Sequence, residues 1–117
     1  MTPETVLSQP ARVLSQQQRE DYFSNGYLAV DSLFGADEVA RIGAVVDEFV
    51  ERSRGESASG SVFDLAPGHC AETPRIRRLK RPHEQHELFW EVATGVLADV
   101  AADLVGPDVV FHHSKLN

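Results

Sequence analysis

The stretch GADEVARIGAVVDEFVERSRG, residues 35–55, is the most regular segment of this 117-residue sequence. Its apolar side chains recur at steps of three and four residues, at Val39, Ile42, Val46, Phe49 and Val50. That spacing is the period of an amphipathic helix. Two acidic residues fall in the first turn and two arginines in the last, which suits the helix dipole. The stretch therefore predicts a helix over residues 36–53.

The segment before this helix predicts a short helix followed by a short strand. In LSQQQREDYFSNG, Ser15 can cap a helix at its start, and Gln18 stands at the spacing of a capping-box partner. Gly26 suits the left-handed residue that ends many helices. We expect a helix over about 16–24 and a strand over 27–30. Residues 1–13 carry two prolines without a period and are expected to form a flexible N-terminal arm.

The second half of the chain predicts further strands and helices. A Gly/Ser loop over 55–61 leads into an irregular stretch with three prolines. Beyond the loop we expect a strand at 76–80, helices at 84–93 and 94–105 with a break at Gly95, and a strand at 108–116. The predicted order is α-β-α-β-α-α-β, a helix-rich α+β chain in which most of a sheet is absent.

Composition limits the classes of function. The net charge is −7, from 11 basic against 18 acidic residues, which argues against nucleic-acid or anionic-membrane partners. The single cysteine, Cys70, cannot form an internal disulfide, so a reducing compartment is expected. The first residues lack the pattern of a secretory signal, and no apolar run approaches the roughly 18–20 residues of a membrane span. We expect one soluble, cytoplasmic domain.

The five histidines offer weak metal-binding signals. His83 and His86 lie three residues apart, and His69 precedes Cys70, so a zinc site built from these four residues is one alternative. Solvated polar residues are the more ordinary explanation. His112 and His113 are neighbours on an expected strand, where they would point to opposite faces.

The run PRIRRLKRP, residues 74–82, holds five cations and no acid in an acidic chain. A solvated face or a partner for the acidic helix is the ordinary interpretation. The alternative is an anion site, because guanidinium groups grip carboxylates and phosphates in a bidentate manner. As a strand, the run would place Ile76, Arg78 and Lys80 on one face. Lys115 would share a face with His113, and a buried lysine there would need an anionic partner.

Several stretches together resemble the start of the phytanoyl-CoA dioxygenase family. They are LSQQQREDYFSNGYLAVDSLFGADEVARI and RIRRLKRPHEQHELFWEVATGVLADVAADLVGPDVVFHHSKLN, which together cover about residues 14–117. The features that carry the resemblance are Tyr22-Phe23, Gly26-Tyr27, Leu33-Phe34 before the acidic helix, and Leu104-Val105-Gly106 before the last strand.

The resemblance implies an enzyme that uses non-haem Fe(II) and 2-oxoglutarate to hydroxylate a small or lipid-like substrate. It implies an α+β chain formed by the N-terminal helices and first strands of a double-stranded β-helix (jelly-roll or cupin-like) oxygenase, with the barrel incomplete. The family's iron ligands begin with His-x-Asp, and no histidine here is followed in that way. We therefore expect no metal ligand and no catalytic residue within these residues, and little cofactor binding or activity from this chain alone.

By position, the resemblance implies early 2-oxoglutarate contacts near Arg78, with Lys80 as the alternative, and at Lys115. His113 would help to line the same pocket. A non-catalytic binding or interaction module derived from that family is the other hypothesis. An exposed strand edge at 108–117 would then favour self-association.

Overall fold

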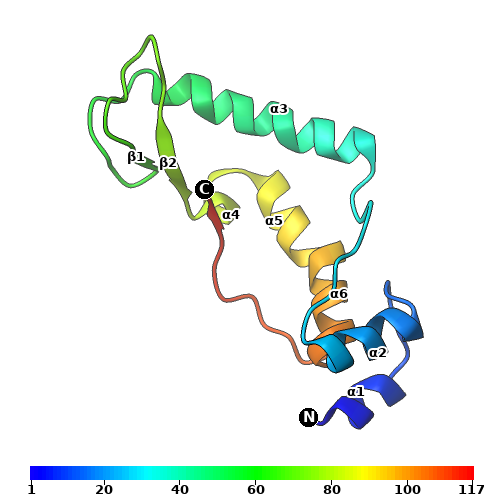
Figure 1. The fold of residues 1–117 in the computed structure, drawn as a ribbon. Coiled ribbons are helices and arrows are strands. Elements are labelled where there is room, and N and C mark those ends of the chain that lie inside the picture. The colour runs from blue at the N-terminus through cyan, green and yellow to red at the C-terminus, as the bar shows by residue number, and fades with distance from the viewer. The chain divides into compact units, whose positions relative to one another are not determined.

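A computed structural model describes all 117 residues, which divide into two compact units (Figure 1). The first unit comprises Met1–Leu33 and Val92–His112, and the second comprises Phe34–Glu91 and His113–Asn117. In chain order the elements are α1 (Pro3–Ser8), α2 (Gln16–Asn25), α3 (Ala36–Ser53), β1 (Phe63–Leu65), β2 (Ile76–Lys80), α4 (Pro82–Gln85), α5 (Glu87–Thr94), α6 (Val96–Val105) and β3 (Lys115–Leu116). The mixture of helices with a small antiparallel sheet agrees with the expected α+β composition.

The caps of α2 are those that the sequence predicts. The Ser15 hydroxyl accepts the Gln18 N–H, and the Gln18 side chain accepts the Ser15 N–H, which completes a capping box. Gly26 ends the helix with φ at +81°, a left-handed conformation that costs glycine little. The strand expected at 27–30 does not form. These residues are β-prone, but no strand of the chain pairs with them, and Tyr27 is 71% exposed.

Residues near the amino terminus form helix α1 in place of the irregular chain that we expect there. Pro3 stands at the start of the helix, where its missing N–H costs nothing, and the Thr2 hydroxyl accepts the Thr5 N–H. Val6 is 2% exposed, and α1 contacts both α2 and α6. Burial of Val6 is one of the contacts that join this segment to the rest of the first unit.

Two buried polar side chains connect separate segments of the first unit through hydrogen bonds. The Asp103 carboxylate on α6 accepts the backbone N–H groups of Arg12, Val13 and Leu14, each at 2.8 Å. The Arg19 guanidinium on α2, 1% exposed, donates to the carbonyl oxygens of Asp103, Gln9 and Val6. These bonds join parts of the sequence that lie up to 91 residues apart.

The same bonds keep the Asp103 carboxylate charged. Burial by itself raises the pKa of this carboxyl, but the N–H groups of Leu14, Val13 and Arg12 and the charge of Arg19 more than offset it. The pKa of Asp103 therefore lies below its ordinary value of 3.8. A charged carboxylate can accept all three N–H groups, whereas a protonated one is a poorer acceptor.

Helix α3 has the limits that periodicity predicts, but it buries a narrower face. Its buried apolar side chains are Val45 and Phe49, whereas Val39 is 56% exposed. The Phe49 ring contacts the rings of Phe63 on β1 and Phe89 on α5, at centroid distances of 6.4 and 6.0 Å. Burial is confined to the second half of α3, because these aromatic contacts all lie there.

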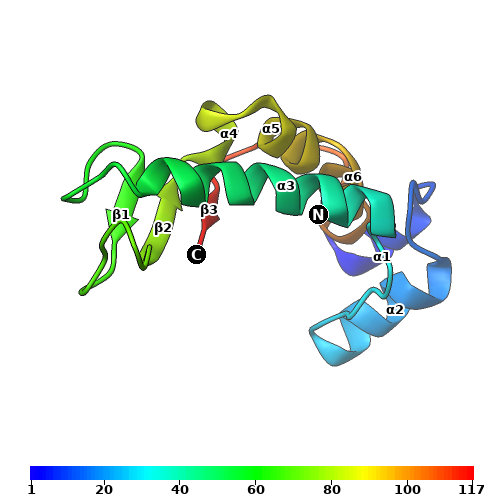
Figure 2. The ribbon, with the colours of Figure 1, turned by 90° about the horizontal axis from the view of Figure 1, so that it is seen from above.

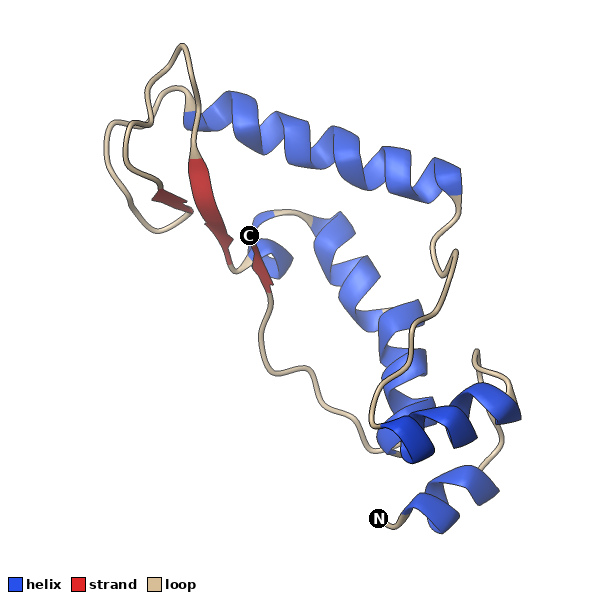
Figure 3. Ribbon diagram, in the orientation of Figure 1, coloured by secondary structure: helices blue, strands red, loops and turns tan.

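The sheet is antiparallel, with the order β1-β2-β3 (Figure 3). Strand β2 has the predicted limits, and β1 lies in a stretch that we expect to be irregular. The strand expected over 108–116 is reduced to the two residues of β3, because only Leu116 and Lys115 find partners, in Leu79 and Lys80. Tan chain in Figure 3 occupies the rest of that segment.

The expected helix break at Gly95 is confirmed. Gly95 has a non-helical ψ of −123° and separates α5 from α6. The short helix α4 is an addition to the expected elements, and its first residue, Pro82, is buried. None of the six helices combines the length and apolar character that crossing a bilayer requires.

Candidate functional site

Strand pairing places three cationic side chains on one face of the sheet. Lys80 lies opposite Lys115 in the antiparallel register, and residues opposite one another share a face. Arg78 lies two residues before Lys80 and shares that face by strand alternation. We call Arg78, Lys80 and Lys115 the cation face.

The other face of the sheet is apolar and packs against α3. Leu79 and its partner Phe63 are each 3% exposed. A cavity of about 170 Å³ lies on this side, lined by Val46, Phe49, Val50, Ile76, Leu79, Leu116 and Asn117. Figure 2 shows α3 running across the strands. The cation face therefore points away from α3.

A β-bulge in β2 interrupts the simple alternation that the sequence predicts for this strand. Asp64 pairs with Arg78 but the next residue, Leu65, pairs with Ile76, so Arg77 is an extra residue in β2. Ile76 consequently shares a face with Leu65 and lines the apolar cavity. Simple alternation predicts that Ile76 shares the face of Arg78 and Lys80, and this prediction is wrong. The bulge separates them and leaves the cation face more polar than simple alternation predicts.

The three cations have different surroundings. The Arg78 Nε donates to the Asn117 Oδ1 at 3.1 Å, and Asp64 lies opposite Arg78 on the neighbouring strand. The Lys80 Nζ donates to the Gly60 carbonyl at 2.8 Å. Lys115 is exposed. Two lysines directly opposite one another repel, which costs about 0.2–1 kcal/mol of stability.

The remaining sequence candidates lie outside this face. His113 is exposed and precedes β3, so the strand ladder does not fix its direction. Arg81 forms an exposed ion pair with Glu84 at 3.1 Å. Nothing in the sequence points to Asp64, Gly60 or Asn117, because their proximity to the cations depends on strand register.

The zinc alternative fails on the geometry of His69. Its Nδ1 accepts the Arg75 N–H at 2.9 Å, so that nitrogen carries no proton. Its Nε2 lies 2.9 Å from the Ser53 carbonyl and therefore donates to it. Both ring nitrogens are occupied by backbone groups, and neither can bind a metal in this arrangement.

The other two histidines of the zinc alternative are also engaged elsewhere. The His86 Nδ1 accepts the Leu88 N–H at 3.1 Å, and the His83 Nδ1 lies 2.7 Å from the Ser114 hydroxyl. Nowhere in the chain do three or more His, Cys, Asp or Glu side chains gather as a metal site requires. The residues present therefore do not fit zinc, and they do not fit the two-His, one-carboxylate ligand set of non-haem iron.

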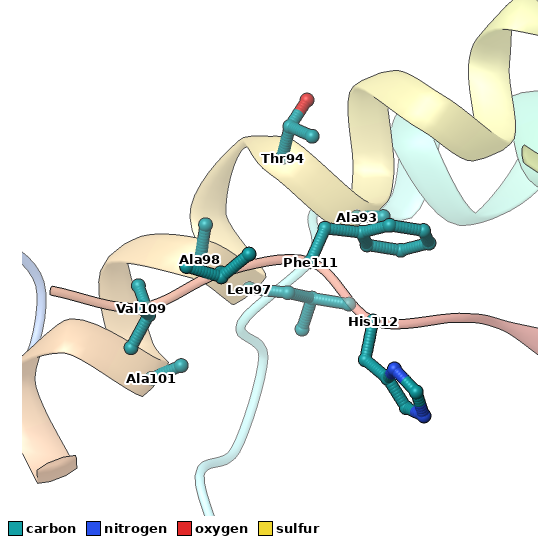
Figure 4. A pocket seen from close by; sticks show the side chains of 9 residues that line it. Ala93, Thr94, Leu97, Ala98, Ala101, Val109, Phe111 and His112 are labelled. Atoms are coloured by element: carbon teal, nitrogen blue, oxygen red, sulfur yellow. The ribbon is translucent and has the colours of Figure 1, made fainter.

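A second candidate site is a cavity of about 430 Å³ in the first unit (Figure 4). Its lining is mainly apolar and consists of Ala93, Thr94, Leu97, Ala98, Ala101, Val109, Val110, Phe111 and His112. Figure 4 shows Phe111 and His112 pointing to opposite sides of the segment that carries them. Small residues on the helix side leave the space open, but the lining presents few groups that could orient a polar ligand.

Comparison with known proteins connects the chain with dioxygenases. It is 26% identical over 106 residues to a probable alpha-ketoglutarate-dependent hypophosphite dioxygenase of Stutzerimonas stutzeri. It is 33% and 29% identical to the ectoine dioxygenases of Stutzerimonas stutzeri and Sphingopyxis alaskensis. These alignments cover 84–90% of this chain.

The chain spans about a third of the length of these relatives, from 31% to 37%. No family model matches the sequence. No solved structure matches the chain either.

Proposed function

We propose that this chain is the N-terminal part of an Fe(II)- and 2-oxoglutarate-dependent dioxygenase of the phytanoyl-CoA dioxygenase type. Its helices and small sheet would then be the start of a double-stranded β-helix. The cation face would bind the carboxylates of 2-oxoglutarate, with His113 at its border. The observation that carries the proposal is the similarity, over most of the chain, to three dioxygenases, one of which is named as alpha-ketoglutarate-dependent.

The chemistry of the cation face supports this ligand. 2-Oxoglutarate carries two carboxylates, and the face holds two ammonium groups and one guanidinium beside the single carboxylate of Asp64. A bound dianion would convert the Lys80–Lys115 repulsion into two attractive contacts, and charge-assisted hydrogen bonds are about twice as strong as neutral ones. The ligands for iron would come from residues other than these 117, since no three suitable side chains gather here.

The relatives favour a small-molecule substrate. Ectoine and hypophosphite, which appear in their names, are both small and polar. We therefore propose a small substrate and place a lipid-like one second.

The test uses the whole gene product that contains these residues, with Mn(II) in place of iron to prevent turnover. Titration calorimetry would measure the Kd of 2-oxoglutarate for Arg78→Ala, Lys80→Ala and Lys115→Ala. We expect losses of about tenfold or more for at least two of them, the size of a lost charge-assisted bond. Arg41→Ala is the matched control. It removes the same charge from an exposed ion pair with Glu91 on α3 and α5, and should change the Kd by less than about twofold.

Succinate formation coupled to oxygen uptake would test the reaction itself. A gene product that binds Mn(II) but neither binds nor consumes 2-oxoglutarate would refute the proposal. Kd values within twofold of wild type for all three variants would remove the cation face from it.

A further inference from the structure

Strand β3 is held to the sheet by a very short ladder. Only two residue pairs, Leu79 with Leu116 and Lys80 with Lys115, define its register. One of those pairs is repulsive. A slip of one residue would move every side chain of β3 to the opposite face, so Lys115 would leave the cation face. Something beyond the ladder must hold the register.

The two ends of the ladder carry side-chain hydrogen bonds. At one end the Arg78 Nε donates to the Asn117 Oδ1 at 3.1 Å. At the other end the His83 Nδ1 lies 2.7 Å from the Ser114 Oγ. Ser114 directly precedes Lys115, and His83 follows the partner strand by three residues. The short ladder is thus bracketed on both sides.

The backbone around His83 is arranged to present this ring. Arg81 adopts a left-handed conformation with φ +47° and ψ +57°, which is uncommon for a residue that precedes proline. The buried Pro82 follows, and the His83 side chain is only 13% exposed. The His83 ring also lies beside the Trp90 ring, at a centroid distance of 6.5 Å. Packing on α5 and a strained turn together hold the imidazole in place.

We infer that His83 and Ser114 form a clasp that fixes the register of β3 and thereby keeps Lys115 on the cation face. His83 is a positioning residue that acts through Ser114. A serine hydroxyl can donate to or accept from an imidazole nitrogen, whereas a one-residue slip would offer His83 either another imidazole or an ammonium. The link to 2-oxoglutarate rests on the proposed function, but the clasp itself rests on the contacts of the second unit.

The test compares disruptive with conservative substitutions in the whole gene product. Ser114→Ala and His83→Phe remove one partner each, while Ser114→Thr keeps the hydroxyl and His83→Asn keeps a polar group near the place of Nδ1. Hydrogen exchange would be measured at the backbone amides of residues 114–117, and the Kd of 2-oxoglutarate would be measured with Mn(II). Melting temperatures would show that each variant is folded.

We expect Ser114→Ala and His83→Phe each to raise the exchange rate at these amides about tenfold. Each should also raise the Kd of 2-oxoglutarate about tenfold, which corresponds to the loss of one hydrogen bond. The Thr and Asn variants should stay within about threefold of wild type. The double variant should be no worse than either single one, because both remove the same bond.

Unchanged exchange in both disruptive variants would overturn the clasp, whatever happens to binding. Failure of the proposed function gives a different pattern. In that case Lys115→Ala and Lys80→Ala leave the Kd unchanged, while Ser114→Ala still raises exchange. That result would support the clasp and remove 2-oxoglutarate from the face.

Discussion

The two units of the chain are stabilised in different ways. The first unit centres on a buried carboxylate and a buried guanidinium, Asp103 and Arg19, which bind backbone groups. The second centres on an aromatic cluster of Phe49, Phe63 and Phe89. The stability that apolar contacts contribute falls in proportion to the apolar area removed. A polar centre loses most of its contribution when a single atom is removed or protonated. The stability of the first unit should therefore depend on pH, and the stability of the second should depend mainly on the volume of its buried side chains.

The largest expected effect is on the aromatic cluster. Phe49→Ala removes a ring that is 3% exposed and contacts two other rings, so it should lower the free energy of unfolding of the second unit by about 4 kcal/mol. Site-resolved hydrogen exchange would measure the two units separately. Val39→Ala, on the exposed part of the same helix, should cost about 0.5 kcal/mol or less. Equal losses from the two variants would show that α3 packs differently.

The next effect is on the polar centre of the first unit. Asp103→Ala leaves three N–H groups without their acceptor and the buried Arg19 charge without its anion, so we expect a loss of about 3 kcal/mol. Asp99→Ala on the same helix is the control, because its ion pair with Arg12 is exposed and contributes little. A loss for Asp103→Ala no greater than that of the control would contradict this account.

A pH titration should separate the two units further. The pKa of Asp103 is lower in the folded chain than its ordinary value, so its contribution is complete above that value and is lost as pH falls through the folded pKa. Denaturation can be followed through NMR signals of each unit between about pH 5 and pH 2. The free energy of unfolding of the first unit should fall more than that of the second. The Asp103→Asn variant should lack this additional weakening. A wild-type loss identical to that of the Asn variant would rule out the carboxylate as its source.

The smallest effect concerns the cation face. Lys115→Gln removes the repulsion with Lys80 and should stabilise the second unit by about 0.2–1 kcal/mol. The gain should shrink as salt screens the pair. Melting temperatures at low and high salt would measure it, with Lys115→Arg as the control that keeps the charge. A destabilisation that is independent of salt would show that Lys115 packs rather than repels.

Local signals in the sequence predicted α2 and α3 well, but not the short helices α1 and α4. Periodicity and charge set the limits of α3, and Ser15, Gln18 and Gly26 set those of α2. These signals act within a few residues along the chain, so sequence alone contains them. The strand expected at 76–80 has the limits of β2.

Long-range pairing could not be predicted in the same way. Residues 27–30 and 108–114 are β-prone, but a strand also requires a partner, and neither segment has one in this chain. The bulge at Arg77 and the bonds of Arg19 with Asp103 depend on contacts between distant residues. Asp99 and Asp103 lie four residues apart on α6, and nothing in that spacing distinguishes the buried acid from the exposed one or identifies its partners.

The same distance has a consequence for synthesis on the ribosome. The backbone of Arg12 binds a carboxylate that is made 91 residues later. At about 5–20 residues per second, the amino-terminal segment waits for roughly 5–20 seconds before its acceptor emerges. By then α3, β1 and β2 are complete and can already pack. The nascent chain can therefore pack α3, β1 and β2 before Asp103 binds the backbone of Arg12. Until then, Arg19 has only nearby acceptors, among them the carbonyl oxygens of Val6 and Gln9.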